Sequence, residues 1–157
     1  MKLYLDLDGV FADFESAVRR LTGENYCPKI SWAKLEKVNH FYKTLYPLSG
    51  ALRLYDTIKY QSTVPVEILT SIPDPTGFLY QADWDKKRWV RHILDGEVKV
   101  NCVRGWEMKS LFTGPGNILV DDSWRNIKDW VACGGIGIHH TSNWNTINQL
   151  RMTGVFK

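Results

Sequence analysis

Residues 1–10 read MKLYLDLDGV, and this opening decides the fold that the sequence predicts. Residues 3–7 are mostly apolar and of strand length, so they predict a buried β-strand whose end carries Asp6, Asp8 and Gly9. Because side chains alternate along a strand, Asp6 and Asp8 lie on the same side. Two neighbouring carboxylates repel each other unless a cation neutralises them, and oxygen ligands of this kind suit Mg²⁺. Gly9 permits a tight turn and the close backbone approach that a phosphate group needs.

Four later apolar runs have the same strand character as the first. They cover residues 66–69, 98–103, 118–120 and 136–139, and predicted helices over 14–22, 85–94 and 123–132 lie between them. Strands that alternate with helices are typical of a parallel α/β sheet. The sequence therefore predicts an α/β fold with a central sheet of five mainly parallel strands.

The length of 157 residues fits a single domain over residues 1–157. Residues 24–62 are rich in aromatic side chains and contain no convincing strand, so we interpret them as a small helical insertion after the first strand and helix. The chain is too short for a second domain with its own core.

Composition excludes several classes of protein. No run approaches the roughly 20 apolar residues that cross a bilayer, and the N-terminus turns acidic too early for a signal peptide. We therefore expect a cytoplasmic protein. Three cysteines without metal-ligand spacing argue against a disulfide framework and a zinc site. The net charge of +3 comes from scattered Lys and Arg residues, which suits an anionic small molecule or a weak nucleic-acid contact and decides neither.

Two other predicted strands also end in polar side chains. Thr70 and Ser71 follow one apolar run, and Asp121 and Asp122 follow another. Thr and Ser after a strand are common turn residues, and two acids at a strand end can simply be hydrated, so each feature alone is weak. The carboxyl ends of parallel strands meet at one crevice, however, and three strands would bring their polar ends together there.

A phosphate site next to a carboxylate also needs a cation, because the two negative groups repel each other. Lys109 lies between the third and fourth strands and is the first candidate. Lys86 and Lys87 begin the helix before the third strand and are the alternatives. The sequence leaves the choice between Lys109 and Lys86 open.

These residues resemble the four motifs of the haloacid dehalogenase (HAD) superfamily of phosphohydrolases. The motifs are a D-x-D-G stretch, a strand-terminal Thr or Ser, a Lys and an acidic pair. Here they read, in the same order, Asp6-Leu7-Asp8-Gly9, Thr70, Lys109 and Asp121-Asp122. The resemblance implies a Rossmann-like three-layer sandwich, with a helical cap inserted over residues 24–62.

A closer resemblance is to the 5'(3')-deoxyribonucleotidase family. The stretches that carry it are DLDGVFADFE, HFYKTLYPLSGAL, ILTSIP, DKKRWV and ILVDDSWRNIKDW. Residues 109–121 are longer than the usual spacing of that family, and the chain is shorter overall, which predicts a reduced insertion. The resemblance implies a phosphoric monoester hydrolase that acts on nucleoside monophosphates, with preference for deoxyribonucleotides.

The same resemblance implies a role for each matching residue. Asp6 would be the nucleophile and Asp8 the general acid and base. The residues assigned to Mg²⁺ are Asp6, the Asp8 backbone carbonyl and Asp121. Thr70 and Lys109 would bind the phosphoryl group, helped by Ser71 and Lys86. Phe41 and Tyr42 would line the nucleoside side of the pocket, and Trp32 is a further candidate for stacking on a base.

Alternative functions stay open from the sequence. One is a phosphatase for another small phosphomonoester or for a terminal phosphate of a nucleic acid, because function depends on the site rather than on the fold. Another is a catalytically silent ligand-binding module, although the intact Asp6 argues against it. We expect a small phosphomonoester as the partner, with no membrane contact and with nucleic acid disfavoured. An exposed aromatic insertion would also suit a homodimer.

Overall fold

The computed structural model contains one sheet of five strands. It describes the backbone of the chain and the side chains of residues 1–27 and 31–157. The strands are β1 (Leu3–Leu5), β2 (Val66–Ile72), β3 (Lys99–Arg104), β4 (Ile118–Asp121) and β5 (Ile136–His139). They are arranged in the order β3-β2-β1-β4-β5, and every neighbouring pair is parallel. The predicted α/β fold class with a parallel five-stranded sheet is confirmed.

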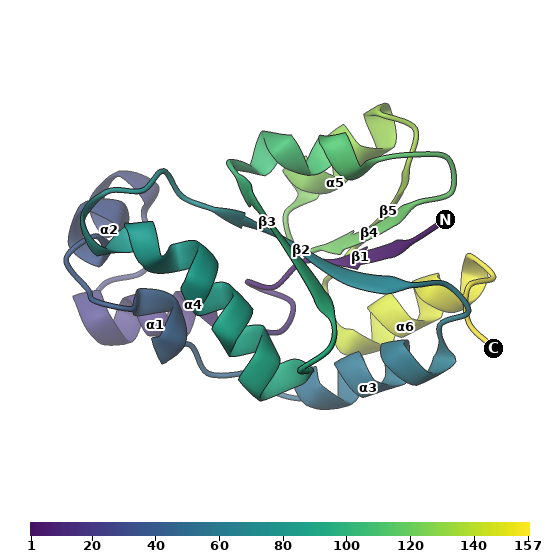
Figure 1. The fold of residues 1–157 in the computed structure, drawn as a ribbon, viewed down its shortest axis with the longest axis horizontal. Helices are drawn as coiled ribbons and strands as arrows, with labels where there is room; N and C mark the ends of the chain where they lie inside the picture. Colours follow the sequence, from purple (N-terminus) through teal and green to yellow (C-terminus); the bar gives the residue numbers. More distant parts are fainter.

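Helices connect the strands on both faces of the sheet (Figure 1). The α-helices are α1 (Phe14–Thr22), α2 (Pro28–Leu35), α3 (Ala51–Gln61), α4 (Ala82–Trp89), α5 (Trp124–Ala132) and α6 (Asn143–Met152). Short 3-10 helices are η1 (Phe41–Thr44), η2 (Gly77–Gln81) and η4 (Trp106–Phe112), and η3 (Val90–Leu94) is a π-helical turn that continues α4.

Alternation along the strands divides the core into two parts. Leu3, Leu5 and the equivalent residues of β2 and β4 belong to a large cluster that includes side chains of α3 and α6. Tyr4 points the other way and packs with Trp130 of α5. Figure 1 shows α5 over one face of the sheet and α3 and α6 over the other. Because each face buries its own set of side chains, the chain forms the predicted three layers.

Some predicted boundaries were wrong, for local reasons. The first strand ends at Leu5 instead of residue 7, because the Leu7 carbonyl accepts hydrogen bonds from the backbone N–H groups of Phe11 and Ala12. That turn draws the chain out of the sheet. The helix predicted over 85–94 begins at Ala82, since η2 runs directly into it.

Residues 24–62 hold α2, η1 and α3. The helix α3 lies beside α6 on one face of the sheet (Figure 1), and Tyr55 and Ile58 of α3 belong to the large core cluster. The helix α2 lies beside α1, at the end of the molecule away from both termini. Among the residues that the structure describes, no helix has the length and apolar character needed to cross a membrane.

Candidate active site

The first strand positions Asp6 and Asp8 at the carboxyl edge of the sheet. Asp6 follows Leu5 directly, and its backbone N–H donates to the Val120 carbonyl at 2.9 Å. Gly9 then turns with a φ of +76°, a conformation that favours glycine. A Cβ atom at Gly9 would lie 2.1 Å from Asp122 Oδ2, so the turn also needs glycine for space. The turn that follows β1 therefore packs closely against Asp122, the residue after β4.

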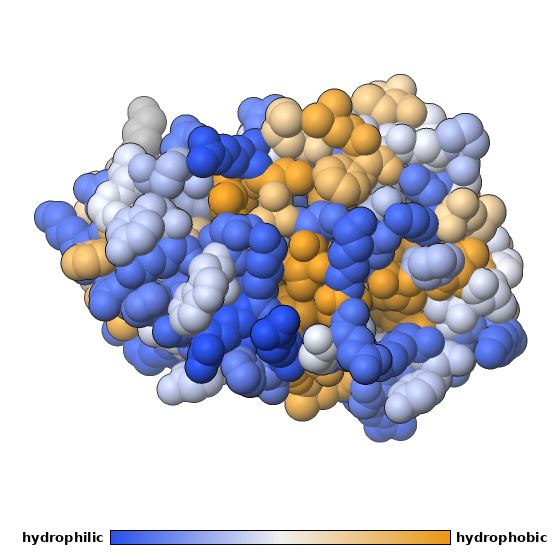
Figure 2. Space-filling view, viewed as in Figure 1, coloured by the Kyte–Doolittle hydropathy of each residue, from blue (hydrophilic) through white to orange (hydrophobic). Residues whose placement is uncertain are grey.

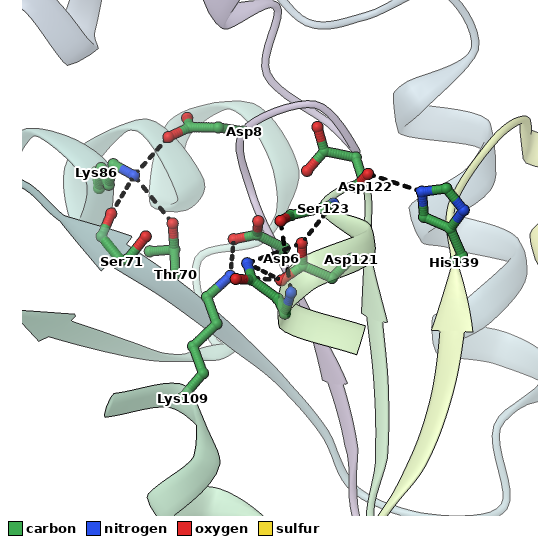
Figure 3. Close-up of polar contacts among 11 residues, drawn as sticks. Asp6, Asp8, Thr70, Ser71, Lys86, Lys109, Asp121, Asp122, Ser123 and His139 are labelled. Atoms are coloured by element: carbon green, nitrogen blue, oxygen red, sulfur yellow. Dashed lines mark hydrogen bonds and ion pairs between the residues drawn. The ribbon is translucent and has the colours of Figure 1, made fainter. Parts of the chain in front are cut away.

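Lys109 of η4 lies between two strand ends. Its Nζ donates to Asp121 Oδ2 at 2.6 Å and is 2.9 Å from Asp6 Oδ1, and all three residues are buried (Figure 3). Burial would lower the pKa of Lys109, but the charges of Asp6 and Asp121 outweigh it and raise that pKa. Lys109 therefore stays positively charged next to Asp6.

Lys86 of α4 occupies the other side of the site. Its Nζ donates to Asp8 Oδ2 at 2.6 Å, Thr70 Oγ1 at 2.9 Å and the Ser71 carbonyl at 2.7 Å. The side chain is completely buried, and Nζ also lies 4.5 Å from the centroid of the Tyr42 ring. The sequence left the choice between Lys109 and Lys86 open. The structure brings both lysines to the site, where Lys86 contacts Asp8 and Lys109 contacts Asp6 and Asp121 (Figure 3).

A group of three carboxylates suits a divalent cation. One carboxylate oxygen from each of Asp6, Asp121 and Asp122 lies within 4.8 Å of the others. Asp6 Oδ1 is buried and has no hydrogen bond with proper geometry, although Lys109 Nζ is near it. Carboxylate oxygens are the hard ligands that Mg²⁺ prefers. The Asp8 carboxylate points toward Lys86 and is not part of this group. Asp122 is part of it, although the sequence analysis assigned no metal-binding role to the second acid of the Asp121-Asp122 pair.

The crowding of these acids raises two pKa values. Burial and the charge of Asp6 raise the pKa of Asp121, against the effect of Lys109. Asp122 is exposed at its outer edge, yet loss of hydration and the charges of Asp6 and Asp121 raise its pKa to about 7. The metal-free site therefore holds a proton more readily than ordinary carboxylates do.

Relative to Asp122→Asn, we expect the melting temperature of the metal-free wild type to fall as the pH rises from about 4 to about 7. A carboxyl whose pKa is raised in the native state stabilises that state fully below its ordinary pKa of 3.8, and this stabilisation is lost as the pH rises through the native pKa of about 7. Thermal unfolding in EDTA would measure it for wild type and Asp122→Asn. Subtracting the melting temperatures of Asp122→Asn from those of wild type removes the contribution of groups that titrate in both proteins. If the melting temperature depended on pH equally in both proteins, Asp122 would not be the group that titrates.

Asp121 is held in place by the beginning of α5. Asn126 Nδ2 donates to both of its carboxylate oxygens, at 3.1 and 2.9 Å, and the Ser123 backbone N–H donates to Oδ1 at 2.8 Å. His139 Nε2 lies 2.9 Å from the Asp122 backbone carbonyl. Sequence reasoning missed Asn126, although its place in the first turns of the helix after the acidic pair was a usable signal.

A pocket of about 540 Å³ opens beside Asp8 and Ser71. The aromatic side chains that line it are Phe14, Tyr26, Trp32, Tyr42 and Trp106. Tyr42 and Trp32 were expected at the pocket. Phe41 was also expected there, but it is 1% exposed and packs edge-to-face on Phe14, whose ring takes the place at the wall. Phe41 and Tyr42 are neighbours in η1, but only Tyr42 faces the pocket while Phe41 faces the core, and the sequence alone does not indicate this difference.

Comparison with known proteins identifies the class of fold. No protein-family model matches the sequence, and no curated protein matches it. Similar solved structures include a hydrolase from Streptococcus pneumoniae, with a TM-score of 0.55, 11% identity and 98% of each chain covered. A HAD-superfamily hydrolase from Ehrlichia chaffeensis has a TM-score of 0.56 and 12% identity, over 97% of this chain and 96% of that one.

A HAD family enzyme from Bacteroides thetaiotaomicron, solved as a magnesium complex, has a TM-score of 0.53 and 13% identity. The alignment covers 94% of this chain and 98% of that one. The chain therefore has the fold of HAD-superfamily hydrolases over almost its whole length. Within that fold, the residues that match the superfamily motifs lie together at the carboxyl edge of the sheet.

Proposed function

We propose that the protein is a Mg²⁺-dependent phosphomonoester hydrolase that forms a covalent aspartyl-phosphate on Asp6. The observation that carries this proposal is the convergence of two buried lysines on Asp6, Asp8 and Thr70 beside an open pocket. A dianionic phosphoryl group next to a carboxylate nucleophile needs fixed positive charge of this kind. A binding module without catalysis would have no need for a buried carboxylate at position 6.

Two displacements complete the reaction. In the first, the Asp6 carboxylate attacks phosphorus, the bond to the leaving oxygen breaks, and the Asp8 carboxyl gives that oxygen its proton. Burial raises the pKa of Asp8 against the opposing charge of Lys86, and a raised pKa makes the Asp8 carboxyl easier to protonate than an ordinary carboxyl. In the second, a water molecule attacks phosphorus while Asp8 takes its proton, the bond between phosphorus and the Asp6 oxygen breaks, and inorganic phosphate leaves with the Asp6 carboxylate restored.

The phosphoryl oxygens would be held by the chain's own cations and hydroxyl. Lys109 Nζ lies next to Asp6, and Thr70 Oγ1 accepts from Lys86, so both lysines and Thr70 are in place before substrate enters. Ser71, which lines the pocket, would add a polar contact. This arrangement stabilises the charge that develops on the transferring group without reorganisation.

Mg²⁺ would be held by Asp6, Asp121 and Asp122, with the Asp8 backbone carbonyl as a further ligand implied by the superfamily resemblance. When bound, it would supply positive charge that offsets the repulsion between the Asp6 carboxylate and the phosphoryl oxygens.

Asn126 is a positioning residue for this cation site, and its removal provides a test. We expect Asn126→Ala to raise the Mg²⁺ concentration needed for half-maximal activity by about 10- to 100-fold, because outer contacts orient metal ligands. Mg²⁺-dependent thermal stabilisation gives a second readout without catalysis. Asn25→Ala, at an exposed position, is the control. An unchanged Mg²⁺ requirement would remove Asn126 from this role.

The proposed substrates are nucleoside monophosphates, with preference for deoxyribonucleotides. Aromatic rings line the pocket next to the phosphate site, and bases stack favourably on such rings. The motif resemblance to 5'(3')-deoxyribonucleotidases supports the same substrate class. Other small phosphomonoesters would share the chemistry at Asp6 but would not use the aromatic wall.

Phosphate release from a panel of substrates tests the proposal. The panel contains ribo- and deoxyribonucleoside monophosphates and phosphomonoesters without a base, each with Mg²⁺ and with EDTA. We expect turnover only with Mg²⁺ and fastest with deoxyribonucleotides. Turnover only of substrates without a base would retain the mechanism and reject the nucleotide preference, and no turnover of any substrate would reject the phosphatase function.

A further inference from the structure

The helix that delivers Lys86 to the active site presents a basic and aromatic surface on its other side. Trp84 of α4 precedes Lys87 and Arg88 by three and four residues, and Arg91 of η3 follows Arg88 and Lys87 by three and four, so these residues share one helical face. All four are exposed, and together with His92 they line a shallow hollow of about 240 Å³. We name the set Lys43, Trp84, Lys87, Arg88 and Arg91 the basic stripe.

Trp84 is at the centre of the stripe. Its side chain is 50% exposed, with Lys43 Nζ 4.5 Å and the Arg88 guanidinium carbon 5.2 Å from the ring centroid. A second hollow, of about 420 Å³, is also bordered by Trp84, together with His40, Tyr80 and Gln81. Trp84 is therefore an exposed ring, fixed by cations from η1 and α4, that borders two hollows.

The charge of this surface is strongly positive. Four of the five stripe residues are cationic, while Asp83 is the acid beside them and pairs with Lys87 at 2.9 Å. Asp85 is buried and pairs with His40 instead. Among side chains that the structure describes, no carboxylate lies within 4.0 Å of Lys43, Arg88 or Arg91. Figure 2 shows hydrophilic residues gathered where α4 lies in Figure 1.

The geometry points to a binding site for single-stranded nucleic acid on the basic stripe. Arg88, Arg91 and Lys87 would contact phosphates, and an unpaired base would stack on Trp84, which is how sequence-independent single-strand sites combine charge with aromatic rings. The helix rises about 10 Å between Trp84 and Arg91, so the stripe is longer than a single phosphate group. An anionic membrane would also attract these cations, so vesicles are included in the test below.

The stripe adjoins the active-site pocket. Thr76 and Leu79 line that pocket, while Tyr80 and Gln81, a few residues on, line the hollow beside Trp84. The segment η2 therefore lies between the active-site pocket and the hollow beside Trp84, and it borders both. The proposed site goes beyond the hydrolase activity, since it is built from residues that have no part in the chemistry at Asp6.

Fluorescence anisotropy with a labelled oligothymidylate that lacks terminal phosphates tests the site. We expect binding that weakens with salt. Arg88→Glu combined with Arg91→Glu should weaken binding at least about tenfold and reduce the slope of log affinity against log salt by about 1.4, because two phosphate contacts are lost. Trp84→Ala should weaken binding about tenfold and leave that slope unchanged.

A matched control separates the stripe from overall charge. Arg53→Glu with Lys128→Glu makes the same change of net charge at exposed positions on α3 and α5, and it should leave the affinity almost unchanged. Asp6→Asn should bind the oligonucleotide as wild type does, so failure of the phosphatase function and failure of this site are distinguishable. Equal weakening in the control, equal affinity for duplex, or binding to anionic vesicles but not to the oligonucleotide would overturn the proposal.

Discussion

Asp6→Asn is expected to lower kcat for phosphomonoester hydrolysis by roughly 10⁴-fold or more. The amide keeps the shape of the side chain but cannot attack phosphorus, so the covalent intermediate cannot form. Asp6 is 6% exposed and its Oδ1 lies 2.9 Å from Lys109 Nζ. Because Asn has nearly the same size as Asp, the variant should fold with the same pocket. Steady-state phosphate release would measure the loss of kcat, and circular dichroism would show whether the fold is retained.

The control for this variant is Asp56→Asn, an exposed carboxylate on α3 that should retain full activity. Wild type quenched in acid during turnover should carry an acyl phosphate that hydroxylamine cleaves, and Asp6→Asn should not. Substantial turnover by Asp6→Asn would place the nucleophile elsewhere in the site.

Lys109→Met is expected to have the second largest effect, on both activity and stability. Removing Lys109 leaves Asp6 and Asp121 buried without their shared cation, and breaking a buried ion pair of this kind costs about 3–5 kcal/mol of unfolding free energy. The loss of the charge beside Asp6 should also lower kcat by roughly 10²- to 10³-fold, as for the removal of one stabilising group at a transition state. Urea unfolding and phosphate release would measure the two effects separately.

Mg²⁺ should partly restore the stability of Lys109→Met, because a bound cation neutralises the same carboxylates. The control is Lys128→Met, which removes an exposed lysine of α5 and should change neither the unfolding free energy nor kcat appreciably. A Lys109→Met variant as stable and as active as wild type would show that the contacts of Lys109 with Asp6 and Asp121 contribute little.

Lys86 differs from Lys109 in the groups it contacts, and this distinguishes their functions. Lys86 joins Asp8, Thr70 and the Ser71 carbonyl, so it links the acid of the proposed mechanism to the phosphate-binding end of β2. Lys109 joins the proposed nucleophile to the end of β4. The two lysines therefore contact different carboxylates of the site, Lys86 the Asp8 carboxylate and Lys109 those of Asp6 and Asp121.

Much of the fold follows from local features of the sequence. The five apolar runs, the D-x-D-G turn and the order of the polar strand ends are sufficient to predict a parallel sheet whose carboxyl edge gathers Asp6, Thr70 and Asp121. These features depend on short-range geometry, because side-chain alternation and turn conformation are set by residues close together in the chain. Boundaries were less predictable, since hydrogen bonds to Leu7 and the junction of η2 with α4 lie outside any periodic pattern.

By itself, therefore, the sequence determined the fold class, the order of the polar segments that close the strands and the residue types available there. Only the tertiary structure decided which lysine contacts which carboxylate, that Asp122 completes the acidic cluster, and that Phe14 instead of Phe41 lines the pocket. Scattered basic residues likewise gather beside Trp84 only in the folded chain. The physical reason is that such contacts join elements far apart in sequence, such as Lys86 and Asp8, and depend on how helices pack on the sheet rather than on local spacing.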